Sequence, residues 1–154
     1  MNEVKMRLKT LIKLAESTVN VFGNWRLAME NLYSPVSGLK LPIVTVRVSP
    51  YSIHEVSFGR RIPESGSMAY VSFTAHCFAE ACETEGEEEY KNAHDLANTI
   101  MTYLATQKWE QTPHNAYSIV DVFDMNARES EPAKGSRKIC RIIVEGTILA
   151  KKLD

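Results

Sequence analysis

The sequence lacks the common motifs that identify catalytic, metal-binding or phosphate-binding sites. Its seven glycines never fall in a GxGxxG or GxxxxGK spacing, so a glycine-rich phosphate loop is not indicated. It has no CxxC, HxH, HExxH or GxSxG motif, and spacing therefore indicates neither a zinc site nor a serine nucleophile. We expect no catalytic residue, no metal and no cofactor, and we predict a protein that is not an enzyme.

Paired cysteines, long apolar runs and an excess of one charge are lacking as well. Three cysteines without paired spacing favour free thiols and a reducing compartment. No apolar run approaches the roughly 20 residues that span a bilayer, and the charged segment 1–13 lacks the apolar stretch of a signal peptide. The net charge of −1, from 18 Lys and Arg against 19 Asp and Glu, disfavours broad binding to nucleic acid. We therefore expect neither a membrane nor a specific nucleic acid as a partner.

Three segments have the apolar periodicity of helices. The first covers residues 4–22 and carries basic side chains on its polar side. A short helix is predicted over 24–32, and a central helix over about 88–108. Thr84 and Glu87 have the spacing of a capping box before the central helix. The apolar stripe of that helix consists of Ala93, Leu96, Ala97, Ile100, Met101 and Leu104.

Five segments are β-branched or alternate with period two, which is typical of strands. They are 42–48, 53–58, 68–79, 117–123 and 139–149. We expect the first two to form a hairpin and the last two to pair as neighbours. In strand 68–79 the alternation predicts an apolar face of Val71, Phe73, Ala75 and Cys77 and a polar face of Tyr70, Ser72, Thr74 and His76. In strand 117–123 it places Val120 and Val122 on the side opposite to Tyr117, Ile119, Asp121 and Phe123.

The order of these segments predicts one α+β domain over residues 1–154. We expect a mainly antiparallel sheet of four to five strands, packed against the central helix and the N-terminal helix. The polar face of strand 68–79 indicates that one side of the sheet meets water or an interface.

A charged segment separates the last two predicted strands. Residues 124–138 contain hardly any apolar side chain, and we predict a charged arm there because the segment is too long for a tight turn. Two interpretations stay open, a mobile solvated tip and an arm that orders on a partner. The candidate contacts with another subunit or partner are cations of this arm and of the loop 59–67: Arg60, Arg61, Arg128, Lys134, Arg137 and Lys138.

Few residues remain as candidates for chemistry. His76 and Cys77 are adjacent on a strand, so they point to opposite faces and cannot share one ligand. Cys77 alternates with core residues and is expected to be a buried thiol. An enzyme or a metal site would have to use Cys82, His94 and the glutamates at 87–89.

A second kind of evidence is the layout of the whole chain. It combines an N-terminal helix, the strand Leu41-Pro42-Ile43-Val44-Thr45-Val46, the step Phe58-Gly59-Arg60 into a loop, the strand 70–78, the helix with Ala93, Leu96, Ala97 and Ile100, and two final strands joined by the charged arm. This layout resembles the tail terminator or tail-completion proteins of long-tailed phages.

The resemblance implies an α+β subunit that assembles into a homo-hexameric ring. Such a ring caps the tail tube, stops its polymerisation and offers a surface to the head connector, without enzymatic activity. The implied partners are further copies of the chain, the tail tube protein and the connector proteins. The implied location is the tail of the virion, after synthesis in the host cytoplasm. The alternative is a small cellular adaptor or ligand-binding α+β domain, with a pocket between the sheet and the central helix.

Overall fold

The computed structural model describes residues 2–33, 41–49, 54–55, 68–107, 117–131 and 138–152. Along these ranges the helices and strands follow in the order α1 Asn2–Ala15, β1 Asn20–Phe22, α2 Trp25–Tyr33, β2 Ile43–Val48, β3 His54–Glu55, β4 Met68–Glu80, α3 Lys91–Ala105, β5 Tyr117–Ser130 and β6 Ile139–Lys152.

All of these strands belong to one sheet, whose continuous order is β1-β2-β4-β6-β5. The two-residue strand β3 pairs with β4 beyond the end of β2. Only β1 and β2 run parallel, and every other pairing is antiparallel. The α+β class and the mainly antiparallel sheet are therefore confirmed, as is the pairing of the last two strands. The parallel pair at the edge was not predicted, because its strand β1 lies in the segment expected to be helical, and β1 is the sixth strand beside the four or five expected.

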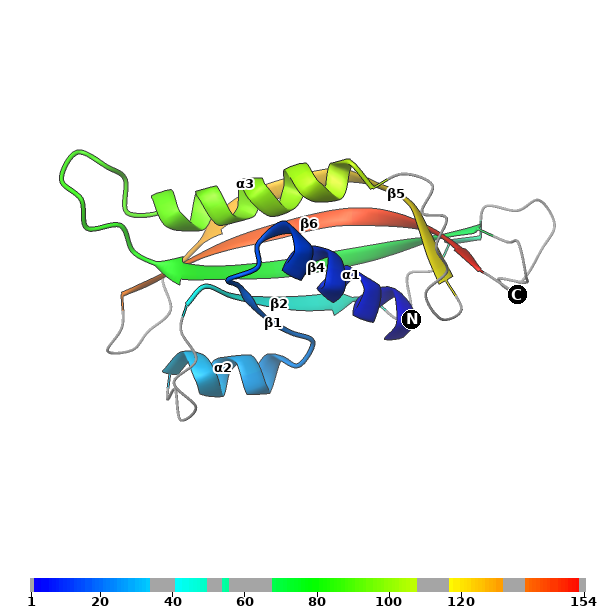
Figure 1. Cartoon of the computed structure of the whole chain (residues 1–154), viewed down its shortest axis with the longest axis horizontal. Coiled ribbons are helices and arrows are strands. Elements are labelled where there is room, and N and C mark those ends of the chain that lie inside the picture. The colour runs from blue at the N-terminus through cyan, green and yellow to red at the C-terminus, as the bar shows by residue number, and fades with distance from the viewer. Residues whose placement is uncertain are drawn as a thin grey trace.

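The main hydrophobic core lies on the side of the sheet that α1 and α3 cover (Figure 1). Leu8 and Ile12 of α1, Ile100 of α3 and Ile142 of β6 are fully buried there. Each such side chain adds about 1.5–3 kcal/mol of hydrophobic stabilisation. The apolar face predicted for β4 belongs to this core, and so do the predicted positions of α3.

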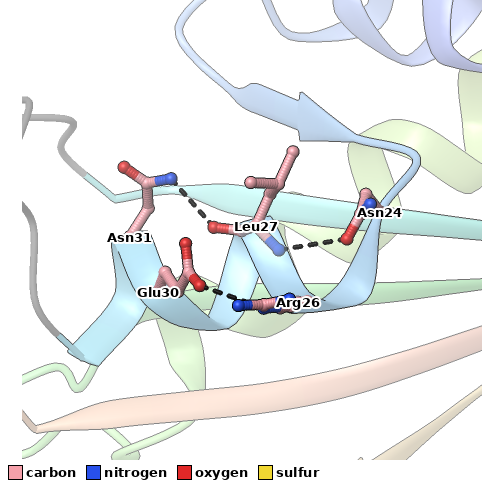
Figure 2. A network of polar contacts seen from close by, with 5 residues as sticks. All are labelled: Asn24, Arg26, Leu27, Glu30 and Asn31. Atoms are coloured by element: carbon pink, nitrogen blue, oxygen red, sulfur yellow. Dashed lines mark hydrogen bonds and ion pairs between the residues drawn. The ribbon is translucent and has the colours of Figure 1, made fainter.

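Helix α2 packs on the opposite side of the sheet, near one end (Figure 1). It buries a second, smaller cluster that consists of Ala28, Leu32, Ile43, Phe78 and Ile139. Asn24 caps the helix, because its Oδ1 accepts a hydrogen bond from the backbone N–H of Leu27 at 3.1 Å. Figure 2 shows this cap with the Arg26–Glu30 ion pair and the bond from Asn31 to the Leu27 carbonyl. The predicted short helix is confirmed.

The first helix is shorter than predicted, because residues after Ala15 leave the helix. The Glu16 carboxylate accepts hydrogen bonds from the hydroxyl and the backbone N–H of Thr18, a local pairing that competes with helical hydrogen bonds. Asn20–Phe22 then forms β1, which pairs with the segment 43–45. Val19 fits the apolar stripe of a helix and a buried position before a strand equally well. Periodicity alone therefore assigned residues 16–22 to the helix, which is wrong.

The predicted arm is also wrong over residues 124–130, which belong to β5. Two β-bulges, at Ile119/Asp121 and Phe123/Asn126, each insert one residue into β5, and Asp124 takes a positive φ of 52°. The bulges also overturn the predicted sides of this strand, since Ile119 and Val122 share the main core. Alternation read without a bulge places them on opposite faces.

Two local predictions are corrected near the ends of other elements. Helix α3 begins at Lys91, after Tyr90 in the N-cap position without a side-chain cap, so the predicted capping box is wrong. Thr84 and Glu87 instead close a backbone turn, with the Glu87 N–H on the Thr84 carbonyl at 3.1 Å. The hairpin of 42–48 with 53–58 is wrong as well, since β2 and β3 both pair with β4. The predicted loop 59–67 lies outside the described residues.

We predict that Gly146→Ala destabilises the protein by about 1–3 kcal/mol, the usual range for overpacking a core. A Cβ at this position of β6 would lie 2.7 Å from Phe73 and 2.8 Å from Met125, and Phe73 is buried. Gly23→Ala is the matched control, because the close atom there is the flexible end of Lys5 at 2.8 Å. Urea unfolding of both variants measures the difference, and equal losses of stability would contradict the packing at Gly146.

Candidate functional site

The side of the sheet opposite to α1 and α3 is covered by α2 only near one end, as far as the structure describes the chain (Figure 1). We call the remainder the open face. Its side chains are set by the strand register, because directly paired residues point to the same side. Three neighbouring rows of this side are, each given from β2 to β5, Arg47, Thr74, Glu145 and Asn126; Thr45, His76, Ile143 and Arg128; Ile43, Phe78, Arg141 and Ser130. Ile43 and Phe78 of the third row lie under α2, so this row forms the border of the open face.

Three arginines from three strands stand on this open face. The Nη2 of Arg128 lies 3.3 Å from the Oε1 of Glu145, in an ion pair between exposed side chains. The Nη2 of Arg141 donates to the hydroxyl of Ser130 at 2.5 Å. Arg47 is exposed and has no ion pair with any other described residue. The three rows therefore hold three guanidinium groups and one carboxylate, that of Glu145.

His76 lies between these cations and is partly covered by α2. The ring of Trp25 meets its imidazole edge to face, with the ring centroids 4.8 Å apart. The pKa of His76 is lowered from 6.5 to about 4, chiefly by burial and then by the charges of Arg141, Arg47 and Arg128, while Glu145 opposes the shift. The imidazole is consequently neutral at pH 7.

Several buried polar atoms of this face lack a hydrogen-bond partner within the described ranges. They are the Oγ1 of Thr45, the Nδ1 of His76 and the Nε of Arg141. Thr45 and His76 are direct partners across β2 and β4. Buried polar groups without a partner are rare in folded proteins, and they often mark a place where a ligand or a partner binds.

A groove of about 380 Å³ runs over the same rows and is lined by Arg47, Val48, Ser49, Ser72, Thr74, His76 and Arg128. Small-molecule sites have volumes of roughly 300–1,000 Å³, so the groove is at the small end of this range. Hydroxyl groups and two arginines are among its lining residues, which gives the groove hydrogen-bond donors and positive charge.

The structure describes two of the six cations predicted as contacts. Arg128 belongs to the open face, whereas Lys138 lies at the start of β6 and pairs with Glu83 at 3.2 Å. The two cations lie in different surroundings. Arg128 belongs to β5, whereas the backbone carbonyl of Lys138 accepts a hydrogen bond from the N–H of Ala81. The other four, Arg60, Arg61, Lys134 and Arg137, lie outside the described residues.

Sequence reasoning missed Arg47, His76 and Arg141 as members of one cationic surface. Alternation within the strand 42–48 already puts Arg47 on the side of Thr45, and alternation within 68–79 puts His76 on the polar face. What could not be read is that β6 lies between β4 and β5, which brings Arg141 and Arg128 to the same face as Arg47.

The residues that an enzyme would use lie outside the three rows of the open face. The Nε2 of His94 lies 2.8 Å from the Oε1 of Glu129, and the backbone N–H of Cys82 donates to the Glu89 carbonyl at 2.9 Å. No group of three or more metal-ligating side chains is found among the residues that the structure places. Cys77 is a buried thiol, as predicted, and burial raises its pKa to about 12.

A second groove, of about 700 Å³, lies where the ligand-binding alternative expects a pocket, between the end of β4 and α3. Glu16, Glu80 and Asp95 give it an acidic character, and Leu96 and Pro42 supply apolar walls. The Asp95 carboxylate already pairs with Lys91 at 3.0 Å. This groove is thus opposite in charge to the groove of the open face.

Comparison with known proteins adds no assignment, because neither a protein-family model nor a curated protein matches the chain. Within the part of the chain that the structure describes, no helix is both long and apolar enough to span a membrane.

We predict that His76 makes the stability of the protein fall as the pH is lowered from about 6.5 to 4. The folded state holds this imidazole neutral, so the unfolded state binds more protons in that window and gains stability as pH falls. We expect His76→Gln to remove about 1–2 kcal/mol of this loss of stability. This is less than the free energy that corresponds to the whole pKa shift, because the ring is partly exposed to solvent.

The measurement is urea unfolding of the wild type and the variant at several pH values. Carboxylates that titrate in the same window affect both proteins, so the difference between the two curves isolates the imidazole. Parallel curves for the two proteins would contradict the lowered pKa.

Proposed function

We propose that this protein is a structural subunit that assembles head to tail into a ring, as a phage tail terminator or head–tail joining protein. In this role the ring is a homo-hexamer that caps the tail tube in the virion, stops its growth and offers a surface to the head connector. The subunit binds its own copies, the tube protein and connector proteins, and it catalyses no reaction.

The observation that carries the proposal is that the sheet ends in two unlike edges. Strand β1 has three residues and runs parallel to β2, whereas β5 has fourteen residues, two bulges and an antiparallel neighbour. No described strand pairs with the outer side of either one. A contact between unlike surfaces is heterologous, and heterologous contacts close into rings when the rotation between subunits permits.

The charges along β5 favour a closed ring of subunits over unlimited pairing of strands between subunits. Asp121, Asp124, Arg128 and Glu129 lie along β5, and charges and bulges at an edge strand block continued main-chain pairing. Contacts made by such charges set register and partner choice more than affinity. The net charge of −1 leaves little repulsion between copies.

Native mass spectrometry over a range of protein concentrations is the test of this function. We expect a closed hexamer that survives dilution, because a ring loses two contacts when it opens to release a subunit. A protein that stays monomeric at all concentrations, and also in the presence of tail tubes, would contradict the ring and favour the ligand-binding alternative.

The predicted contact cations are tested by the double variant Arg128→Ser, Lys138→Ser. Each is an exposed cation with a carboxylate partner, and a loss of about 1.4 kcal/mol per interface raises the concentration for ring dissociation about tenfold. The matched control is Arg26→Ser, Lys91→Ser, which removes two exposed cations that pair within α2 and α3. Equal assembly of the two variants would remove Arg128 and Lys138 from the interface.

A further inference from the structure

We propose that the groove of the open face binds the phosphate group of a small molecule between Arg47 and Arg128. The site does not require ring formation, although Arg128 is also one of the cations proposed to contact a neighbouring subunit. Its members come from β2, β4 and β5 and are brought together by the sheet register alone.

The groove offers more hydrogen-bond donors than a carboxylate can use. Two guanidinium groups, each with five N–H donors, line the groove together with the hydroxyls of Ser72 and Thr74. A carboxylate has two oxygens, whereas a phosphate has at least three that can accept from the arginines and from these hydroxyls. Arginine also matches phosphate geometry with paired N–H groups.

The balance of charge at the groove is positive. Arg141, Arg47 and Arg128 lower the pKa of His76, and the Glu145 carboxylate raises it. Glu145 is held by one nitrogen of Arg128, so the remaining donors of that guanidinium stay open to a ligand. Arg47 has no ion pair with any described residue, and an arriving phosphate would give it one.

His76 supplies the second line of evidence for a ligand. Its Nδ1 is buried without a hydrogen-bond partner among the described residues, while the ring itself lines the groove. Trp25 fixes the orientation of that ring from the α2 side. A neutral imidazole held in this way can donate one hydrogen bond to a phosphate oxygen.

The surroundings favour a small molecule over a nucleic-acid backbone. Backbone binding needs a stripe of cations that neutralises several phosphates in a row. Beyond the groove the same face carries Asp121 next to Leu149, and Tyr70 meets Phe123 edge to face with the ring centroids 5.7 Å apart. A carboxylate and an aromatic pair therefore separate the arginines of the groove from Lys151, the next cation that the register places on this face.

The first experiment is a titration of the full chain with sodium phosphate against sodium chloride at equal ionic strength, followed by NMR. We expect saturable shifts of the His76 ring and the Arg47 and Arg128 side chains, with a dissociation constant on the order of 1 mM for a few charge-assisted hydrogen bonds. A titration with adenosine monophosphate distinguishes a phosphomonoester, which should bind more tightly, from the free ion. The proposal is overturned if phosphate causes no more change than chloride.

Substitutions then locate the binding. Arg47→Ala should weaken phosphate binding about tenfold or more, because it removes a charge-assisted contact. Arg26→Ala is the matched control, since Arg26 is an exposed arginine of α2 that pairs with Glu30 away from the groove lining, and binding should stay unchanged. Thermal unfolding checks that both variants fold. Equal weakening in both, or none in Arg47→Ala, would overturn the site.

Two further outcomes also decide against the proposal. Acetate that binds as tightly as phosphate would reassign the groove to carboxylates. A duplex DNA that binds through Arg47 while phosphate and adenosine monophosphate do not would reassign it to a nucleic-acid backbone. In contrast, phosphate binding that is lost in Arg47→Ala and retained in Arg26→Ala supports the site whether the protein is a ring or a monomer.

Discussion

The antiparallel pairing of β4 with β6 is the interaction on which the other parts of the structure depend. It joins all thirteen residues from Met68 to Glu80 to β6, against six residues for the pairing of β4 with β2. Both helices of the main core pack on the face that these two strands form with their neighbours. The ladder joins residues that are between 59 (Glu80 with Ile139) and 83 (Met68 with Lys151) positions apart in the chain, so the whole of α3 and β5 must be folded back before it is complete.

The same ladder explains why the molecule has two unlike sides. Odd-numbered positions of β4 from Val71 to Cys77 enter the core, and the even-numbered positions between them stay on the open face. With α2 covering only the Phe78 end, the middle of that face is left to Arg47, His76 and Arg128. A protein that places arginines on its uncovered sheet face, and a neutral histidine between them, is arranged for contact with an anion or with another protein surface.

Much of the fold could be predicted because apolar periodicity is a local property. The β4 faces, the α3 stripe and the α2 segment follow from spacing alone, and the structure confirms them. The errors arose where a long-range partner overrides a local pattern. Residues 20–22 continue the apolar pattern of the first helix, but they form a strand because they pair with β2. Polar residues 124–130 become strand because β6 pairs with them across two bulges.

The candidate site was harder to predict than the fold. Arg128 was identified from its charge, but it was assigned to a loop, and its neighbours on the open face were not recognised. Strand order decides which arginines meet, and the insertion of β6 between β4 and β5 is a non-local fact. The orphaned Nδ1 of His76 depends on α2 folding over it, which no spacing in the sequence can reveal.

Amide hydrogen exchange is the measurement that tests most directly whether the β4–β6 ladder organises the molecule. The account predicts that the slowest-exchanging amides belong to the buried stretches of β4 and β6 around Ala75 and Val144, because these open only with global unfolding. Amides of β1 and α2, at the edge and on the less covered side, should exchange faster. Protection that is as low around Ala75 and Val144 as in β1 and α2 would contradict the central role of this pairing.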